Sequence, residues 1–357
     1  MGLPKQTRTR DTNVMNEERL QEILSCFSEK RVLVVGDFYL DAYWLIDQKK
    51  STLSLETPWY TSPVVEQHYS PGAAGTVTNN LKSLGVGEVY AIGIIGQDNF
   101  GMTLLESLES NGCSTRFMIQ TNERVTPTYL KPIYCGQDEI RTEGSRFDIE
   151  NHTETPDLIQ NLLITNLRQC LQTVDAVIIV DQTTKDNVGG ITDFVREHLC
   201  YLSIQMPEKF FLADSRSRIG KYRNVMIKPN QFEAKYAIDP KWSGESVSLD
   251  ESKKSGQKLH EQTSAPVIVT CGQEGILIFD ESNINHVPGI PLQCQTDTVG
   301  AGDSVSAGLM STLASGGNLT EAALVGNLVA SVTVTKIGTT GTASPAELVE
   351  RLSSLPS

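Results

Sequence analysis

Apolar and polar residues follow two rhythms along the chain. Short apolar runs that end in glycine or a polar residue predict buried parallel strands. Apolar residues spaced three or four positions apart predict helices. The predicted strands are 31–37, 89–96, 175–181, 210–215, 224–230 and 266–272, and the predicted helices are 15–29, 73–81, 100–112, 165–174, 303–314 and 321–338. This alternation predicts an α/β fold with a mostly parallel central sheet and helices on both faces.

Two stretches, about 42–70 and 126–146, have neither rhythm. They are rich in Thr, Ser, Tyr, Val and Pro, which is typical of exposed or half-covered strands. We expect them to form a small β lid beside the main sheet. The domain organisation that follows is an N-terminal tail and helix over 1–30, and a single domain over 31–357 that carries the lid.

Composition narrows the class of protein. The 357 residues carry a net charge of −13, which argues against nucleic acid as the main partner. Seven scattered cysteines without a CxxC pair favour reduced thiols over disulfides or a zinc site. No signal-peptide pattern opens the chain, and no run is apolar enough to cross a membrane. We therefore expect a cytoplasmic protein with no membrane partner.

Polar residues follow several of the predicted strands. In sheets of this type, ligands bind at the carboxyl ends of the strands. The residues at those ends are Asp37, Asp181, Asp214, Asn230 and Thr270. The sequence predicts a binding site that gathers them.

The segment DTVGAGD, residues 297–303, precedes a predicted helix. Gly300 and Gly302 let backbone N–H groups approach an anion, and the N-terminus of a helix adds positive potential. Asp303 then has two interpretations. It is either an acid–base group beside the anion site or an N-cap of the helix, since Asp is among the favoured caps.

Two further segments enter helices. In KPNQFEA, residues 228–234, Asn230 and Glu233 either hold a hydrated Mg²⁺ or form a capping box. In PGAAGTVTNNL, residues 71–81, the small residues fit either a ligand turn or close helix–sheet packing. A P-loop and a GxGxxG fingerprint after the first strand are both missing from the sequence, which disfavours P-loop NTPases and dinucleotide-binding proteins.

DTVGAGD resembles the second signature of the PfkB (ribokinase-like) carbohydrate kinases. The resemblance runs from RVLVVGDFYLD to KIGTTGTASPAEL, nearly the whole chain. GIIGQDNFG, SRFDIEN and KPNQFEA make the sequence most similar to the heptose-7-phosphate kinase domain of bifunctional heptose kinase/adenylyltransferases. The resemblance implies a ribokinase-like fold, ATP and Mg²⁺ as cofactors, and a sugar or sugar phosphate as substrate.

The resemblance also implies roles for single residues. Asp303 matches the catalytic base, and Gly300, Ala301 and Gly302 match the anion hole. Asn230 and Glu233 match the NxxE motif that orders Mg²⁺ and the phosphates, and Asp297 matches the start of a loop that binds a monovalent cation, K⁺, in several members. The expected nucleotide site contains Asn230, Glu233, Thr270, Gly272, Gly275 and Asn327. The expected sugar site contains Asp37, Asp41, Gly72, Ala73, Thr76, Arg146 and Asp181.

The sequence departs from the family pattern in the sugar site. Thr76 stands where the first signature, GGxxxN, has asparagine, and Asp214-Ser215-Arg216 stands where the subgroup has Asp-Pro-Lys. Cations for a phosphorylated substrate are Lys131, Arg141, Arg146, Lys185, Arg216 and Arg218, of which the last two follow a strand end most closely. Each of them also fits a solvated surface charge.

The predicted function is ATP-dependent phosphorylation of a sugar or sugar-phosphate hydroxyl, with heptose 7-phosphate as the first candidate. Two alternatives stay open: a kinase of an ordinary sugar such as ribose or fructose, and a non-catalytic sugar or nucleotide sensor. Lids of this family also form dimer contacts, so Trp44, Leu53, Trp59 and Tyr60 are expected either in a homodimer interface or in core packing. A second, adenylyltransferase activity is expected only on another polypeptide.

Overall fold

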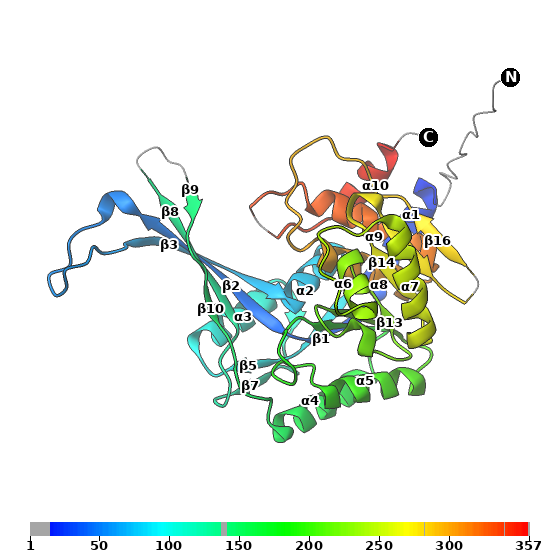
Figure 1. Cartoon of the computed structure of the whole chain (residues 1–357), viewed down its shortest axis with the longest axis horizontal. Helices are drawn as coiled ribbons and strands as arrows, with labels where there is room; N and C mark the ends of the chain where they lie inside the picture. Colours follow the sequence, from blue (N-terminus) through cyan, green and yellow to red (C-terminus); the bar gives the residue numbers. More distant parts are fainter. Residues whose placement is uncertain (1–14, 137–140, 282, 339, 356–357) are drawn as a thin grey trace.

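A long twisted sheet forms the centre of the molecule (Figure 1). The computed structural model describes residues 15–136, 141–281, 283–338 and 340–355. Within them the central sheet has the strand order β16-β15-β14-β13-β12-β11-β1-β4-β6. Its strands are β1 (Arg31–Gly36), β4 (Glu88–Ile92), β6 (Cys113–Ser114), β11 (Ala176–Asp181), β12 (Phe210–Ser215), β13 (Met226–Ile227), β14 (Val267–Thr270), β15 (Ile276–Phe279) and β16 (Ile284–Val287). Every pair from β6 to β14 is parallel, and β15 and β16 extend the edge antiparallel.

Helices cover both faces of this sheet, as the alternation of strands and helices predicted. One face packs against α1 (Glu17–Ser25), α2 (Ala74–Ser83), α3 (Asn99–Ser110), α8 (Ala301–Ala314), α9 (Leu319–Thr333) and α10 (Pro345–Ser353). The other packs against α4 (Asp157–Cys170), α5 (Asp193–Gln205), α6 (Gln231–Ile238) and α7 (Leu249–Thr263). In β1, Val32 and Val34 enter the first cluster, and Leu33 and Val35 enter the second. A strand buried on both faces must be apolar throughout, which explains the unbroken apolar runs.

A second sheet projects from the main body, on the left of Figure 1. It consists of β2 (Phe38–Asp47), β3 (Val64–Ala73), β8 (Thr128–Cys135), β9 (Arg141–Glu143) and β10 (Phe147–Ile149). The segments 42–70 and 126–146 predicted as a β lid lie in this sheet or connect its strands. The sheet is larger than predicted, because β2 begins directly after β1 and β10 extends to Ile149.

Two predicted strands differ in extent. The single strand over 89–96 is wrong: β4 ends at Ile92, and β5 (Ile94–Gly96) pairs instead with β7 (Ile119–Thr121). The break falls at Gly93, where a Cβ would lie 2.5 Å from the ring of Phe38 on β2, so this close approach of the two segments requires glycine. Of the predicted strand 224–230, only Met226–Ile227 pair as β13.

The predicted N-terminal helix lies at α1, where Leu20 and Ile23 enter the main hydrophobic cluster. The first 14 residues of the predicted tail lie outside the described residues. In the described part of the chain, each helix is too short or too polar to cross a lipid bilayer.

Candidate active site

The start of α8 is built by a glycine and not by Asp303. Gly300 is the N-cap, with φ 77° and ψ 0° in the left-handed region that favours glycine. Asp303 is the third residue of the helix and makes no capping hydrogen bond. The capping interpretation of Asp303 is therefore wrong. Because Gly300 occupies the N-cap position, the carboxylate of Asp303 is not used as a cap. It is half-buried among other charged groups.

Those groups come from the carboxyl ends of β12 and β13. Lys228 Nζ lies 2.9 Å from Asp214 Oδ2, and both side chains are almost fully buried. Glu233 lies near them, with Oε1 3.7 Å from Arg216 Nη1. The charges of Asp214, Lys228 and Arg216 all act on Asp303. We call Asp214, Arg216, Lys228, Glu233 and Asp303 the charged cluster.

Two carboxyl groups of the charged cluster have pKa values raised toward neutral pH. Burial raises the pKa of Asp303 to about 7, and the negative charge of Asp214 adds to the effect. Burial likewise raises the pKa of Glu233 to about 7, again with help from Asp214. Burial lowers the pKa of Lys228, but the carboxylates around it, Asp214 first, raise it overall, so Lys228 stays charged. When all five groups are ionised, three carboxylates face two cations, Arg216 and Lys228.

Backbone N–H groups of the predicted anion hole lie beside this cluster. Ala301 N donates to Thr298 O at 3.2 Å, so that group is already used within the turn. Gly302 is exposed, and a Cβ there would have Lys228 Nζ, 3.5 Å away, as its neighbour. An anion at Gly302 would thus lie between the open N-terminus of α8 and a buried ammonium group.

The NxxE pair forms the capping box that was one of its two interpretations. Asn230 Oδ1 accepts hydrogen bonds from Phe232 N and Glu233 N, and Glu233 Oε2 accepts one from Asn230 N at 2.9 Å. The capping box leaves Glu233 Oε1 near Arg216. The metal role of the pair stays a prediction.

The predicted nucleotide residues lie together at the end of β14. Thr270 bridges to Asn230 and donates its N–H to Pro229 O at 3.0 Å. Gly272 and Gly275 both have positive φ, and Cys271 N donates to Gly275 O across the tight loop between them. Asn327 on α9 donates to Pro288 O at 3.1 Å, directly beyond β16.

Asp297 lies at the opposite side of the α8 entrance. Its N–H donates to Val334 O at 2.8 Å, and its Oδ1 accepts from Val299 N at 3.0 Å. The loop is thereby attached to the last turn of α9. The cation role of Asp297 stays a prediction.

Asp41 and Gly72 meet on the second sheet. A Cβ at Gly72 would lie 2.5 Å from Asp41 Oδ2, so only glycine leaves room for that carboxylate. Asp41 Oδ1 pairs with Lys131 Nζ at 2.9 Å. The negative charge of Asp41 also makes a small contribution to the raised pKa of Asp303.

The turn after Gly72 is strained. Ala73 has φ 51° and ψ −116°, a conformation that glycine adopts far more easily, and it serves as the N-cap of α2. Thr76 is buried, donates to Pro71 O at 3.4 Å, and packs its methyl group beside Gly300. The Thr76 hydroxyl is thus bonded to the backbone, and its methyl group lies beside Gly300. Thr76 therefore connects the first turns of α2 and α8.

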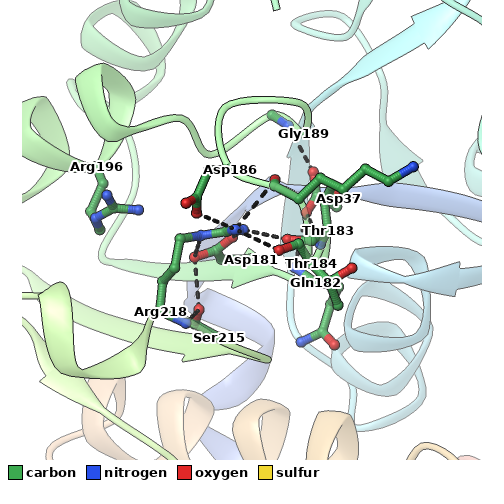
Figure 2. A network of polar contacts seen from close by, with 12 residues as sticks. Asp37, Asp181, Gln182, Thr183, Thr184, Asp186, Gly189, Arg196, Ser215 and Arg218 are labelled. Atoms are coloured by element: carbon green, nitrogen blue, oxygen red, sulfur yellow. Dashed lines mark hydrogen bonds and ion pairs between the residues drawn. The ribbon is translucent and has the colours of Figure 1, made fainter. Parts of the chain in front are cut away.

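Asp37 and Asp181 bind the protein itself (Figure 2). Asp37 accepts hydrogen bonds from the N–H groups of Gln182, Thr183 and Gly190 at 2.7–2.9 Å. Asp181 is fully buried and forms an ion pair with Arg218. Both residues were expected in the sugar site. In this structure the oxygens of Asp37 hold the segment 182–190, whereas Asp181 accepts from Ser215, Arg218 and Tyr222.

The predicted cations are distributed differently from the expectation. Arg218 is buried with Asp181 and is not free for a phosphate. Arg146 lies over the ring of Tyr129, 3.9 Å from its centroid, and pairs with Asp148. Sequence reasoning missed Lys228, although its place just before Pro229 and Asn230 at a strand end was a usable signal.

A magnesium ion fits the charged cluster only through water and phosphate. Among the residues that the structure describes, no group of three or more His, Cys, Asp or Glu side chains could hold a metal on its own. Mg²⁺ typically keeps several waters and takes one or two carboxylates plus phosphate oxygens. Glu233 and Asp303 are carboxyl groups that could contact such a hydrated ion beside nucleotide phosphates.

The fold and the charged cluster indicate a phosphotransferase. The features that are typical of this class are parallel strand ends, an open helix N-terminus, a buried lysine and a carboxyl group of raised pKa. Comparison with known proteins agrees. Residues 45–347 match the pfkB family carbohydrate kinases, and the chain belongs to that family.

Two curated relatives are named Bifunctional protein HldE. The protein of Nitratiruptor sp. is 31% identical over 325 residues, which cover 90% of this chain and 65% of that protein. The protein of Wolinella succinogenes is 32% identical over 337 residues, which cover 93% of this chain and 66% of that protein. The chain thus spans about two thirds of the length of these relatives.

Solved structures show the same fold. Arabidopsis thaliana ribokinase complexed with ribose and ATP superposes with a TM-score of 0.65 at 16% identity, covering 90% of this chain and 98% of the ribokinase. Escherichia coli phosphofructokinase-2 in complex with potassium superposes with a TM-score of 0.67 at 19% identity, covering 91% of this chain and 98% of that chain. The fold is therefore ribokinase-like, as predicted.

Proposed function

We propose that this protein transfers the γ-phosphate of ATP to a hydroxyl of a sugar or sugar phosphate, with Asp303 as the base. One observation carries the proposal. The carboxylate of Asp303, with a pKa of about 7, stands at the open N-terminus of α8 within the charge field of Lys228 and Asp41. A carboxyl with this pKa can accept a proton near neutral pH, and the N-terminus of the helix favours the transferring phosphoryl group.

The other residues of the site orient the two substrates and stabilise the charge of the transferring phosphoryl group. The N–H group of Gly302 and the ammonium of Lys228 offset the negative charge of the phosphoryl group in transit. Thr270, Gly272, Gly275 and Asn327 hold the nucleotide, and Asp41 holds sugar hydroxyls. Mg²⁺, held through water by Asn230 and Glu233, neutralises phosphate charge when bound. We assign Asp297 to a K⁺ loop on the same grounds of resemblance.

For the acceptor we propose heptose 7-phosphate. The support is the similarity to proteins named HldE, together with the motifs quoted above. A smaller sugar is the second candidate, since a solved structure of the same fold holds ribose and ATP. All seven cysteines are free thiols, which supports a reducing, cytoplasmic location.

The test is sugar-stimulated ADP release by purified protein over a panel of sugars and sugar phosphates. Asp303→Asn keeps the size of the side chain and removes the proton acceptor. We expect it to lower kcat by about 10³-fold while ATP binding, measured by calorimetry, stays within a few-fold. Asp250→Asn, at an exposed position in the first turn of α7, is the matched control and should leave turnover unchanged.

Two outcomes would contradict the proposal. Near-normal turnover of Asp303→Asn would remove the role of base. Sugar and ATP binding without ADP release for every acceptor would favour the sensor alternative. An acceptor preference for ribose or fructose would keep the kinase and replace the heptose.

A further inference from the structure

The two cations of the charged cluster are held very differently. Lys228 has 3% of its side chain exposed, and its Nζ lies 2.9 Å from Asp214 Oδ2. Arg216 has 59% of its side chain exposed, and its one ion-pair partner among the described residues is Glu233. The 3.7 Å between Arg216 Nη1 and Glu233 Oε1 make an ion pair without a hydrogen bond. Lys228 is therefore fixed in place, whereas the side chain of Arg216 is free to change partner.

The carboxyl group of Glu233 has one oxygen that the helix cap does not use. Its Oε2 accepts from Asn230 N in the capping box, and Asn230 Oδ1 already accepts from Phe232 N and Glu233 N. Glu233 Oε1 is thus the carboxyl oxygen of the NxxE pair that is left for a hydrated Mg²⁺. It is also the oxygen that Arg216 faces. Because like charges repel, a guanidinium and a dication compete for this oxygen.

The backbone places Arg216 at the edge of the sheet where we propose that the phosphates bind. Arg216 directly follows β12, and its N–H donates to Asp181 O, at the end of β11, at 3.0 Å. Its main chain is anchored there, while its side chain stays mostly exposed. The positive charge of Arg216 also acts on Asp303. Since ligands of such sheets bind at these strand ends, an anion bound there meets an exposed guanidinium on a fixed backbone.

The residue type at position 216 suits a change of partner. Arginine stands here where the most similar subgroup has lysine. A lysine ammonium is a compact, strongly hydrated point charge, whereas a guanidinium presents a planar set of donors that matches two phosphate oxygens at once. A guanidinium is also more weakly hydrated. Arginine therefore favours the exchange of one oxyanion for another over a permanent contact with water.

We propose that Arg216 binds the phosphates of the nucleoside triphosphate, and that its guanidinium moves there from Glu233 when the nucleotide arrives with hydrated Mg²⁺. The inference rests on the proposed function, because it uses the same triphosphate site beside Gly302 and Lys228. Without nucleotide, Arg216 neutralises Glu233. With nucleotide, the guanidinium leaves Glu233 Oε1 to the dication and offsets phosphate charge. Arg216 thus disfavours the free ion at this position and favours the metal–nucleotide complex.

The proposal predicts opposite effects on metal and nucleotide when the guanidinium is removed. In Arg216→Met, a divalent ion alone no longer competes with a guanidinium and should bind more tightly. The metal–nucleotide complex loses a charge-assisted contact and should bind more weakly. Arg216→Lys separates contact from charge, because it keeps the positive charge and removes the planar set of donors.

The experiment measures two dissociation constants on the full chain. Binding of Mn²⁺ alone is followed by the EPR signal of the free ion, and binding of magnesium AMP-PNP, a non-hydrolysable ATP analogue, by calorimetry without acceptor. The variants are Arg216→Met and Arg216→Lys, each also in a Glu233→Gln background. Arg168→Met, which removes an exposed arginine on α4, is the matched control. ADP release over the sugar panel is measured in parallel.

Arg216→Met should bind magnesium AMP-PNP about 10-fold more weakly and Mn²⁺ alone about threefold more tightly than the wild-type protein. Arg216→Lys should lose about threefold in nucleotide affinity and leave the affinity for Mn²⁺ unchanged. In the Glu233→Gln background, the effect of Arg216→Met on Mn²⁺ should disappear and its effect on the nucleotide should remain. Arg168→Met should change neither constant.

Several results would overturn the inference. Unchanged nucleotide affinity in Arg216→Met, or wild-type affinity in Arg216→Lys, would remove the phosphate contact. Equal Mn²⁺ affinity in the wild-type protein and Arg216→Met, or no Mn²⁺ binding by either, would remove the exchange at Glu233. In each of these cases, sugar-stimulated ADP release by the wild-type protein would leave the kinase proposal standing. Nucleotide binding that depends on Arg216, without ADP release for any sugar, would refute the kinase proposal and support the inference.

Discussion

At the scale of single residues, the proposed mechanism involves two carboxyl groups, Asp303 and Glu233, each with a pKa of about 7. Burial is the main cause for both Asp303 and Glu233, and the negative charge of Asp214 adds to it. Lys228 reduces the electrostatic repulsion among these carboxyl groups, because its Nζ lies 2.9 Å from Asp214 Oδ2. A carboxyl group whose ionised form is destabilised by burial has a raised pKa, so it accepts a proton more readily near neutral pH.

The raised pKa of Asp303 predicts an effect on stability. Its pKa is about 7 in the folded protein and 3.8 as the model-peptide value, so the stability from this group is full below pH 4 and lost as pH rises through 7. Asp303→Asn cannot ionise and should raise the free energy of unfolding by about 1–2 kcal/mol at pH 8. Urea denaturation without nucleotide at pH 8 and pH 4 measures this. A gain equal at both pH values would contradict the burial argument.

At the scale of elements, the segment 182–190 shows how a buried ion pair shapes a loop. Arg218 follows β12, Asp181 ends β11, and Tyr222 donates to the same carboxylate at 3.2 Å. Asp37, at the end of β1, holds the same segment from the other side. Three neighbouring strands thus end on a single loop, which is held from both sides.

Loss of the Arg218–Asp181 ion pair should lower the free energy of unfolding markedly. Arg218→Met leaves Asp181 buried without its partner, and such a change typically lowers the free energy of unfolding by about 3–5 kcal/mol. The double variant Asp181→Asn/Arg218→Met removes the unpaired charge and should recover part of the loss. Arg168→Met, at an exposed position on α4, is the control. Chemical denaturation of the four proteins provides the measurement, and a double variant no more stable than Arg218→Met would show that the unpaired buried charge is not the cause of the loss.

At the scale of the whole molecule, the second sheet extends away from the core and carries apolar residues at its far end (Figure 1). Leu53, Leu55, Trp59 and Tyr60 have exposed fractions of 58–103%. Core packing of Leu53, Trp59 and Tyr60, one of the two alternatives from the sequence, is therefore wrong. Trp44, by contrast, is half-buried. An exposed apolar group of this size favours burial against another surface. We propose that it forms the homodimer contact expected from the resemblance.

The dimer proposal predicts the effect of two substitutions. Leu55→Ser/Trp59→Ser should convert a dimer to a monomer in analytical ultracentrifugation at micromolar concentration, because it removes apolar area from the contact. Tyr201→Ser/Ile204→Ser, which changes two equally apolar exposed residues on α5, should leave the mass unchanged. A monomeric wild-type protein, or a dimer that survives the first pair of changes, would refute the proposed interface.

Local sequence determined most of the central strands and helices and the glycine turn at Gly300, because burial on two faces, helical periodicity and backbone conformation are properties of short segments. The strand 210–215 was predicted with its observed bounds for that reason. Only the tertiary structure decided which charges are free. Arg218 and Asp181 are 37 positions apart in the sequence and pair in the interior, whereas Lys228 pairs with Asp214 and its charge also acts on Asp303. Charge pairing depends on distances in space between strand ends, and no local pattern contains those distances.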